Sequence, residues 1–363
     1  MPNTPKPQEK NDLQTKTSSF WLIITMLVGA LGAFIAVELN LTLALLLGPV
    51  VATMIASLLG YPMQVPHKFR MSVLVIMGAV MASRFTPDVL DYILIWPLSL
   101  LCVPLFIILA FVSVGMYNTK VAGFDKATAY FSAMPGGLLI MAAMGSQYGG
   151  DEPRIALAHI LRIVVSVFLL AFAFWAFLGI STDQIAFFQQ GMNVDAIPLL
   201  EVLLLACVGG YVAHYLKVPA PSLMGPLLLI APLYIGSWID VEIPGPLIAL
   251  ALLVLGSSIG SRFVGYNVHM LAQLSFHAVV STIIMLVIGL ILAIILSSFT
   301  SIPFAAALLA FSPGGIAEST LIAIALDVNP AYVAVHHLIR IVLCGLAAPF
   351  LARLTGFHSE HSL

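Results

Sequence analysis

The most chemically distinctive residues of this sequence occur in two copies. Pro-Gly-Gly stands at 135–137 and again at 313–315, and a histidine followed three residues later by an arginine stands at 159–162 and again at 337–340. Both motifs recur at a shift of 178 residues, in strongly apolar surroundings. Backbone amide and guanidinium groups at such depth can bind an anionic solute. The candidate substrate-binding residues are Pro135, Gly136, Gly137, His159, Arg162, Pro313, Gly314, Gly315, Glu318, His337 and Arg340.

Each Pro-Gly-Gly tripeptide is expected to interrupt a helix at membrane depth. Proline removes a helix hydrogen bond and clashes with the preceding turn, and glycine further disfavours the helix. Interrupted backbone is tolerated in a bilayer only beside protein or a water-filled cavity. The restarting helix presents free amide groups that favour an anion, and transporters use such discontinuous helices in pairs. Alternatively, the tripeptide only kinks the helix or allows close packing.

Arg162 and Arg340 each lie well inside an apolar segment. An arginine at the centre of a spanning helix costs about 2.5–3.5 kcal/mol, and each leucine or valine returns about 0.3–0.6 kcal/mol, so one arginine per helix is tolerable. Such a charge needs a counter-charge or a wet cavity. His159 and His337 share a helix face with their arginines because of the three-residue spacing. Alternatively, both arginines extend to a membrane interface.

Glu318 stands in the first turn of the helix expected after Gly315, where free amide groups favour a carboxylate. Its expected partner is Arg340 or Arg162, and the corresponding first-half position is Ile140. One carboxylate facing two arginines would leave net positive charge, which suits an anionic substrate. Glu318 is therefore a candidate proton carrier, with a fixed structural counter-ion as the alternative.

The remaining residues form no recognisable catalytic or metal-binding motif. The three cysteines stand singly in apolar segments and are expected to act as small buried hydrophobes. Adjacent helical residues such as His336 and His337 point about 100° apart, which is unfavourable for binding one metal ion. We therefore expect no catalytic residue, no metal and no cofactor. The loop 149–154 is expected to be a solvated turn that opens a helix. Lone polar residues interpreted as packing residues are Glu201, His214 and His277.

The composition indicates a multi-pass membrane protein. Of 363 residues, 61% are hydrophobic and only 8% are charged, whereas roughly a quarter are charged in soluble domains. Apolar runs of about 20 residues recur along the chain, and each is a candidate spanning helix. The formal net charge of −2 gives no indication of a nucleic-acid partner. The expected partners are a small-molecule solute and the lipid bilayer, and the chain could form a homo-oligomer.

Further landmarks support an internal duplication. The 178-residue shift maps Arg84 of "ASRF" onto Arg262 of "GSRF", and a shift of 177 maps the Gly-Pro pair at 48–49 onto the one at 225–226. We therefore expect an all-α polytopic membrane protein with two homologous repeats. Each repeat would have about five to six transmembrane segments and one helix broken at Pro-Gly-Gly. The segments are expected near 20–37, 41–59, 70–83, 90–116, 126–147 and 154–178, then 198–216, 221–238, 244–261, 268–298, 302–326 and 331–353.

These segments predict the organisation of the chain but leave its symmetry open. The expected regions are a disordered cytoplasmic tail at 1–19, membrane repeat 1 at 20–178, a linker at 179–197, membrane repeat 2 at 198–354 and a C-terminal tail at 355–363. Segment 70–83 is short for a crossing, and six crossings per repeat would make the repeats parallel, whereas five would invert the second. Lys217 and Arg262 fit an inverted copy and Arg353 a parallel one, so positive charges favour inversion only slightly.

Several motifs together carry a resemblance to a known family. The duplicated elements are "LLLGPVVA" and "SLMGPLLL", "SRF", "FSAMPGG" and "FSPGGIAES", and "HILRIV" and "HHLIRIV". Over about residues 20–355 they resemble the AbrB family of bacterial inner-membrane proteins, which is distinct from the soluble DNA-binding regulator of that name. The resemblance implies a multi-pass protein of the bacterial inner membrane. The family places a glutamate three residues after the second glycine, which Glu318 matches and Ile140 does not.

Three functions follow from these observations. The residues favour a secondary transporter or permease for a small, anionic or amphipathic solute, bound at the repeat interface between broken helices and arginines. The resemblance brings two further labels, a membrane-embedded regulator and an ammonia monooxygenase. An oxygenase needs clustered histidines or carboxylates around an open metal position, which the sequence does not display. A regulator needs an effector domain or docking surface, and no loop is long enough for a domain. We therefore predict a transporter rather than an enzyme.

Overall fold

The computed structural model describes residues 7–354, apart from 42, 86, 88–95, 179–193, 219 and 267. Within this part of the chain, all elements are helices. In chain order they are α1 (Pro7–Glu38), α2 (Ala44–Leu58), α3 (His67–Ala82), α5 (Trp96–Lys120), α6 (Lys126–Ala133), α7 (Leu138–Gln147), α8 (Glu152–Leu178), α10 (Ala196–Tyr215), α11 (Pro221–Ile235), α12 (Gly245–Gly260), the 3-10 turn η1 (Ser261–Phe263), α13 (Val268–Phe299), α14 (Phe304–Ala310), α15 (Ile316–Ala325) and α16 (Pro330–Leu354).

Seven helices of the described residues are long and apolar enough to cross a membrane. They belong to α1, α5, α8, α10, α12 (with η1), α13 and α16. Helices α1, α5, α10 and α13 expose most of their apolar side chains, whereas α8 and α12 are mostly buried. Exposed apolar surface of this extent is stable against lipid rather than water. The structure is therefore that of an all-α, multi-pass membrane protein.

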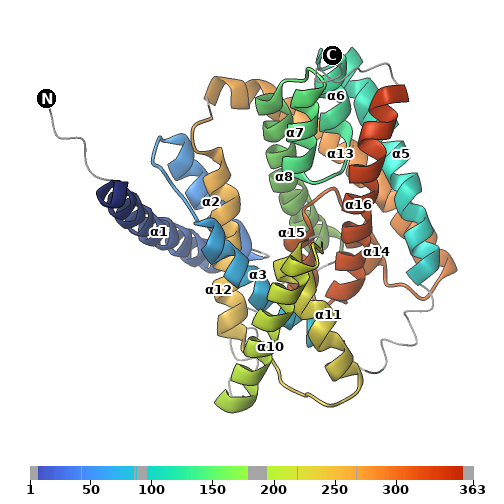
Figure 1. Ribbon diagram of the computed structural model, residues 1–363. Helices are drawn as coiled ribbons and strands as arrows, with labels where there is room; N and C mark the ends of the chain where they lie inside the picture. Colours follow the sequence, from blue (N-terminus) through green and yellow to red (C-terminus); the bar gives the residue numbers. More distant parts are fainter. Residues whose placement is uncertain are drawn as a thin grey trace, which may run out of the picture.

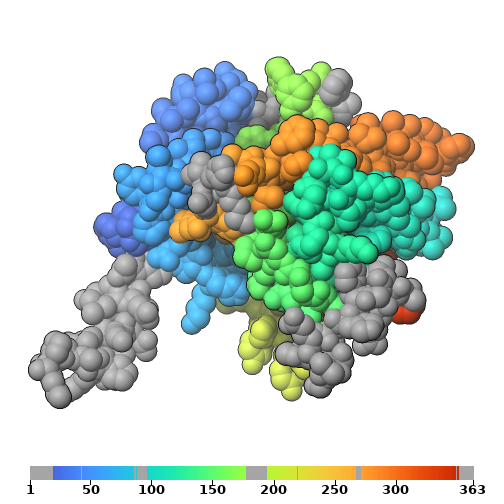
Figure 2. All heavy atoms as spheres, turned by 90° about the horizontal axis from the view of Figure 1, so that it is seen from above, coloured from blue at the N-terminus to red at the C-terminus, as the bar shows by residue number. Residues whose placement is uncertain are grey.

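The helices form two bundles, which lie side by side in Figure 1. Bundle 1 consists of α1–α3, α10–α12 and η1, and bundle 2 of α5–α8 and α13–α16, because the main helix contacts fall within these two groups. Each bundle thus draws helices from both halves of the sequence. Helices α3 and α16 contact each other across the boundary. Seen from above, the blue residues of α1–α3 lie on the opposite side of the molecule from the teal residues of α5 (Figure 2).

Close helix packing in bundle 1 depends on glycines that recur in both halves. A Cβ atom on Gly32 of α1 would collide with the carbonyl group of Gly48 on α2, and the reverse also holds. Gly209 of α10 and Gly225 of α11 form the same contact, 177 residues later. Small residues at membrane helix interfaces allow such backbone approach. The Gly-Pro landmarks of the sequence therefore mark helix-packing positions.

The ends of the chain and its middle limit the comparison with the expected regions. Helix α1 begins at Pro7, inside the segment 1–19 expected to be a disordered tail, and its apolar spanning part starts at Ser19. Most of the expected linker 179–197 lies outside the described residues, and α10 begins at Ala196. The expected C-terminal tail at 355–363 also lies outside them. The region boundaries remain predictions.

Candidate solute-binding site

Two short helix pairs in bundle 2 contain the Pro-Gly-Gly tripeptides. Helix α6 ends at Ala133 and α7 begins at Leu138; α14 ends at Ala310 and α15 begins at Ile316. Gly137 and Gly315, the residues before α7 and α15, have extended backbone with ψ angles of 132° and 157°. The carbonyl groups at the ends of α6 and α14 therefore lack the partners that a continuous helix would supply.

Arg162 of α8 supplies partners for the carbonyl groups after α6. Its Nη1 donates to the carbonyl oxygen of Met134 at 3.1 Å, and its Nη2 contacts that of Gly136 at 3.4 Å. Nη2 also lies 2.8 Å from Nδ1 of His159. The other ring nitrogen of His159 is 3.0 Å from the carbonyl oxygen of Phe131. Arg162 is 5% exposed and His159 is fully buried, so both lie inside the protein rather than at an interface.

Arg340 of α16 forms the same arrangement after α14. Its Nη1 donates to the carbonyl oxygen of Ser312, and its Nη2 donates to that of Gly314 at 2.6 Å. His337 lies 3.3 Å from Nη2 of Arg340, and its Nε2 is 2.9 Å from the carbonyl oxygen of Leu309. Arg340 is 3% exposed. Guanidinium groups at helix carboxyl ends are electrostatically favourable. Both terminal nitrogens of each arginine are thus bound to backbone, which leaves only Nε of Arg162 and Arg340 without a partner.

The two helix interruptions pack against each other's second arginine helix. A Cβ atom on Gly136 would lie 3.1 Å from Cβ of Cys344 on α16. A Cβ atom on Gly314 would lie 3.2 Å from Oγ of Ser166 on α8. Cys344 and Ser166 are themselves 178 residues apart. The structure therefore brings the sequence-predicted residues of the two halves together around the centre of bundle 2.

Glu318 does not have the partner expected from the sequence. Its carboxylate lies 3.8 Å from the Arg262 guanidinium group of η1, whereas Arg162 and Arg340 bind backbone carbonyl groups instead. Glu318 is 7% exposed, and a Cβ atom on Gly315 would collide with its carboxylate. The side chain therefore folds back over the start of α15. Arg70 of α3 is close enough to interact with the charges of both Arg262 and Glu318.

The carboxylates at the two ends of α15 both pair with arginines of bundle 1. Asp327 follows α15 and binds Arg84, which follows α3, with 2.9 Å between Oδ1 and Nη1. Glu318 at the start of α15 pairs with Arg262 after α12. Because Arg84 and Arg262 are corresponding residues of the two halves, α15 lies between equivalent arginines. Helix α15 occupies a central position between the bundles in Figure 1.

Comparison with known protein families assigns the chain. The family model described as "Transition state regulatory protein AbrB" matches residues 45–356. This chain belongs to the AbrB family. It is 29% identical over 327 residues, covering 90% of the chain and 93% of the relative, to "Putative regulator AbrB" of Escherichia coli (strain K12). It is 24% identical over 276 residues, covering 70% of each chain, to "Uncharacterized protein YhjN" of Bacillus subtilis (strain 168).

The structure of this AbrB-family protein also shows polar residues that sequence analysis did not select. Tyr117 of α5 bonds His277 of α13 at 2.9 Å, and Ser281 donates to Asn118 at 3.1 Å. Gln273, His277 and Ser281 stand four residues apart, which places them on one face of an otherwise apolar helix. This spacing was the available signal, and His277 was wrongly treated as a lone packing residue.

The remaining titratable residues of this AbrB-family chain form no metal centre in the described part of the structure, where no group of three or more His, Cys, Asp or Glu residues could hold an ion. His336 is fully buried and lies 2.9 Å from Oγ of Ser99 and 2.7 Å from the carbonyl oxygen of Tyr332. Cys344 is buried, whereas Cys102 is half-buried and Cys207 is exposed. The expectation that all three cysteines are buried is therefore wrong for Cys207, because α10 is an outer helix with mostly exposed side chains.

Proposed function

We propose that this protein is a secondary transporter for a small anionic solute, built from two inverted repeats in the bacterial inner membrane. The solute would bind between the two bundles, next to Glu318, Arg262 and Arg70. The observation that carries the proposal is the buried charge cluster at the start of α15, where two arginines surround one carboxylate. Movement of one bundle against the other would expose this cluster to the two sides of the membrane in turn.

The duplicated network of hydrogen bonds supports the two repeats. Arg162 and Arg340 contact carbonyl groups 28 and 26 residues before them in each half. In bundle 1, Gly78 of α3 packs on Leu223 of α11, and Gly256 of α12 packs on Leu46 of α2. These contacts are reciprocal between the halves, as expected of two copies related by a two-fold axis. The interrupted pairs α6/α7 and α14/α15 would then be corresponding broken helices.

The directions of the long helices support inversion. The end of α5 lies beside the first part of α13, because Asn118 bonds Ser281. The start of α5 lies beside the start of α16, because Ser99 bonds His336. Helix α16 ends near the short helix α6, where Tyr130 donates to the carbonyl oxygen of Ala348. Corresponding helices α5 and α13 therefore run in opposite directions, which can be followed in Figure 1, and this is the relation that inverted repeats require.

The charges at the inter-bundle cluster support an anionic solute. Arg70 and Arg262 carry two positive charges against the single negative charge of Glu318. Nε of Arg70 is buried and has no hydrogen-bond partner. Buried charge without full compensation is unfavourable, and an anionic group of a solute would supply the missing charge. Arg162 and Arg340, by contrast, would hold the interrupted helices in place rather than bind the solute directly.

The experiment that tests this function first compares metabolites between cells that make the protein and cells that lack it. A solute that differs is then supplied to proteoliposomes containing the wild-type chain, Glu318→Gln or Glu201→Gln. Glu201 is an exposed carboxylate on α10 and serves as the matched control. We expect Glu318→Gln to lower uptake at least tenfold and Glu201→Gln to leave it unchanged. Equal uptake by all three proteins would contradict the proposed site.

A membrane-embedded regulator is the second candidate, because the Escherichia coli relative is called a regulator. Under this alternative the protein would act through a partner, and Glu318→Gln would alter gene expression without altering any solute flux. Measuring transcript levels and uptake with the same variant separates the two functions. The proposed transporter requires the loss of uptake whether or not transcripts change.

A further inference from the structure

A small polar cavity lies between α5, α6, α8 and α13 in bundle 2. Its volume is about 20 Å³, which is room for one water-sized occupant. The polar residues lining it are Asn118, Ser132, Arg162, His277 and Ser281, and no aspartate or glutamate is among its lining residues. The cavity therefore combines a buried positive charge with hydroxyl, amide and imidazole groups.

Two buried polar atoms of lining residues have no hydrogen-bond partner. They are Oγ of Ser132 and Nε of Arg162, and the two residues are 6% and 5% exposed. A buried donor left unsatisfied costs about 1–3 kcal/mol, so an occupant that accepts from both groups would be stabilised. The terminal nitrogens of Arg162 already bind the carbonyl groups of Met134 and Gly136. The remaining donor and the net positive charge favour an anion over a cation.

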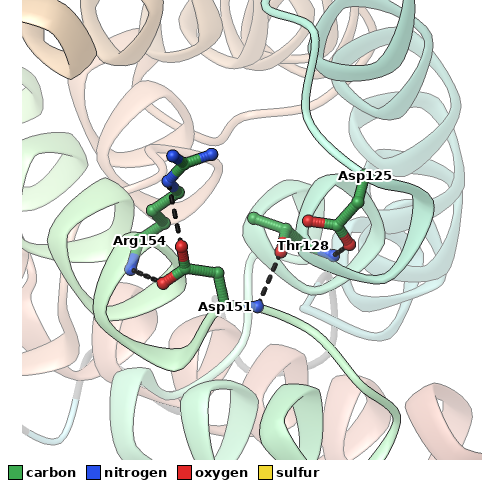
Figure 3. A network of polar contacts seen from close by, with 4 residues as sticks. All are labelled: Asp125, Thr128, Asp151 and Arg154. Carbon is green, nitrogen blue, oxygen red and sulfur yellow. Dashed lines mark hydrogen bonds and ion pairs between the residues drawn. The ribbon is translucent and has the colours of Figure 1, made fainter.

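A wider surface hollow leads to this cavity. It measures about 500 Å³ and shares Phe124, Leu274 and His277 with the cavity. Its rim includes Asp151 and Arg154, which form an ion pair with 3.0 Å between Oδ2 and Nε. Figure 3 shows this pair with Thr128, whose hydroxyl accepts from the amide of Asp151, and with Asp125, which caps α6. An occupant could thus enter beside the start of α8 and pass His277.

The corresponding place in the other half is filled by a side chain. Ala158 lines the cavity, and the residue 178 positions later is His336. His336 is fully buried and bonds Ser99, which corresponds to His277. The ring of His336 also packs against Tyr332 and Phe311. The alanine at position 158 therefore leaves open a space that a histidine closes in the second half.

We propose that the cavity between α5, α6, α8 and α13 is a binding site for one small inorganic anion, of halide size, held by Arg162 and Ser132 and reached past His277. This site is separate from the cluster around Glu318, and it stands or falls independently of the transport proposal. The bound anion would neutralise the guanidinium charge of Arg162 in the centre of bundle 2.

The test measures the unfolding temperature of the purified full-length protein in sodium bromide and in sodium gluconate at equal ionic strength. Gluconate is too large for a cavity of about 20 Å³. A ligand that binds only the folded protein raises the unfolding temperature as its concentration rises. We expect bromide to raise it relative to gluconate in the wild type, Ser132→Ala to reduce this rise, and Ala158→His to abolish it. Ser72→Ala, an exposed serine on α3, should keep the full rise.

Each other outcome decides against the site. No difference between bromide and gluconate in the wild type would mean that the cavity holds only water. An equal bromide-dependent rise in the wild type, Ser132→Ala and Ala158→His would mean that bromide acts elsewhere. If Ala158→His fails to fold, Ser132→Ala decides alone, because this change installs the residue type that stands at the corresponding position 310.

Discussion

At the scale of single residues, Gly315 has a more specific role than its counterpart in the first half. Both Gly315 and Gly137 have backbone angles that alanine adopts readily. A Cβ atom on Gly137 would meet its nearest neighbour at an ordinary 3.6 Å, whereas one on Gly315 would collide with the carboxylate of Glu318. We predict that Gly315→Ala displaces Glu318 from Arg262 and lowers uptake of the solute several-fold. Gly137→Ala should retain uptake, and equal loss in both variants would contradict this role.

The arginines of bundle 2 are predicted to be sensitive even to lysine. Arg340 binds two carbonyl groups through two nitrogens, which a single ammonium group cannot reproduce in the same geometry. Each hydrogen bond to a charged group contributes about 1.5–3 kcal/mol. We predict that Arg340→Lys and Arg162→Lys lower the unfolding temperature clearly. Arg154→Lys should change it little, because its surface ion pair contributes about 1 kcal/mol or less. Unchanged unfolding of both buried variants would argue against this structural role.

At the scale of helices, the glycines of bundle 1 are predicted to set the distance between α1 and α2. Gly32→Ala forces apart the backbones of Gly32 and Gly48, and overpacking of this kind typically costs about 1–3 kcal/mol. Gly345 is also helical but has no neighbour within 4 Å of an added Cβ atom. Gly345→Ala should therefore stabilise the protein by up to about 1 kcal/mol through helix propensity. Unfolding temperatures of the two variants in detergent test this contrast, which opposite signs would support.

Features of single helices could be predicted from the sequence better than contacts between helices. The histidine-arginine pairs were predictable, because a spacing of three residues fixes which side chains share a face. Their partners were not, because the carbonyl groups of Met134 and Gly136 belong to another helix and carry no side-chain signature. For the same reason the partner of Glu318 was mispredicted: Arg262 lies far away in the sequence, on the other bundle.

At the scale of the whole molecule, the account predicts that the two repeats cross the membrane in opposite directions. Lys120 at the end of α5 and Ser298 near the end of α13 are exposed and stand 178 residues apart. In a chain without its native cysteines, Lys120→Cys and Ser298→Cys should react with a membrane-impermeant thiol reagent from opposite sides. Reaction of both from the same side would mean that the repeats are parallel.

The central claim is that transport requires the two bundles to move relative to each other. Arg84 and Asp327 form an ion pair between the bundles, with side chains 28% and 87% exposed. The most direct test is therefore to replace both with cysteine, join them with a cleavable bifunctional thiol reagent, and measure solute uptake by the same proteoliposomes before and after cleavage. We predict that cross-linking abolishes uptake and that cleavage restores it. Full uptake by the cross-linked protein would contradict the claim.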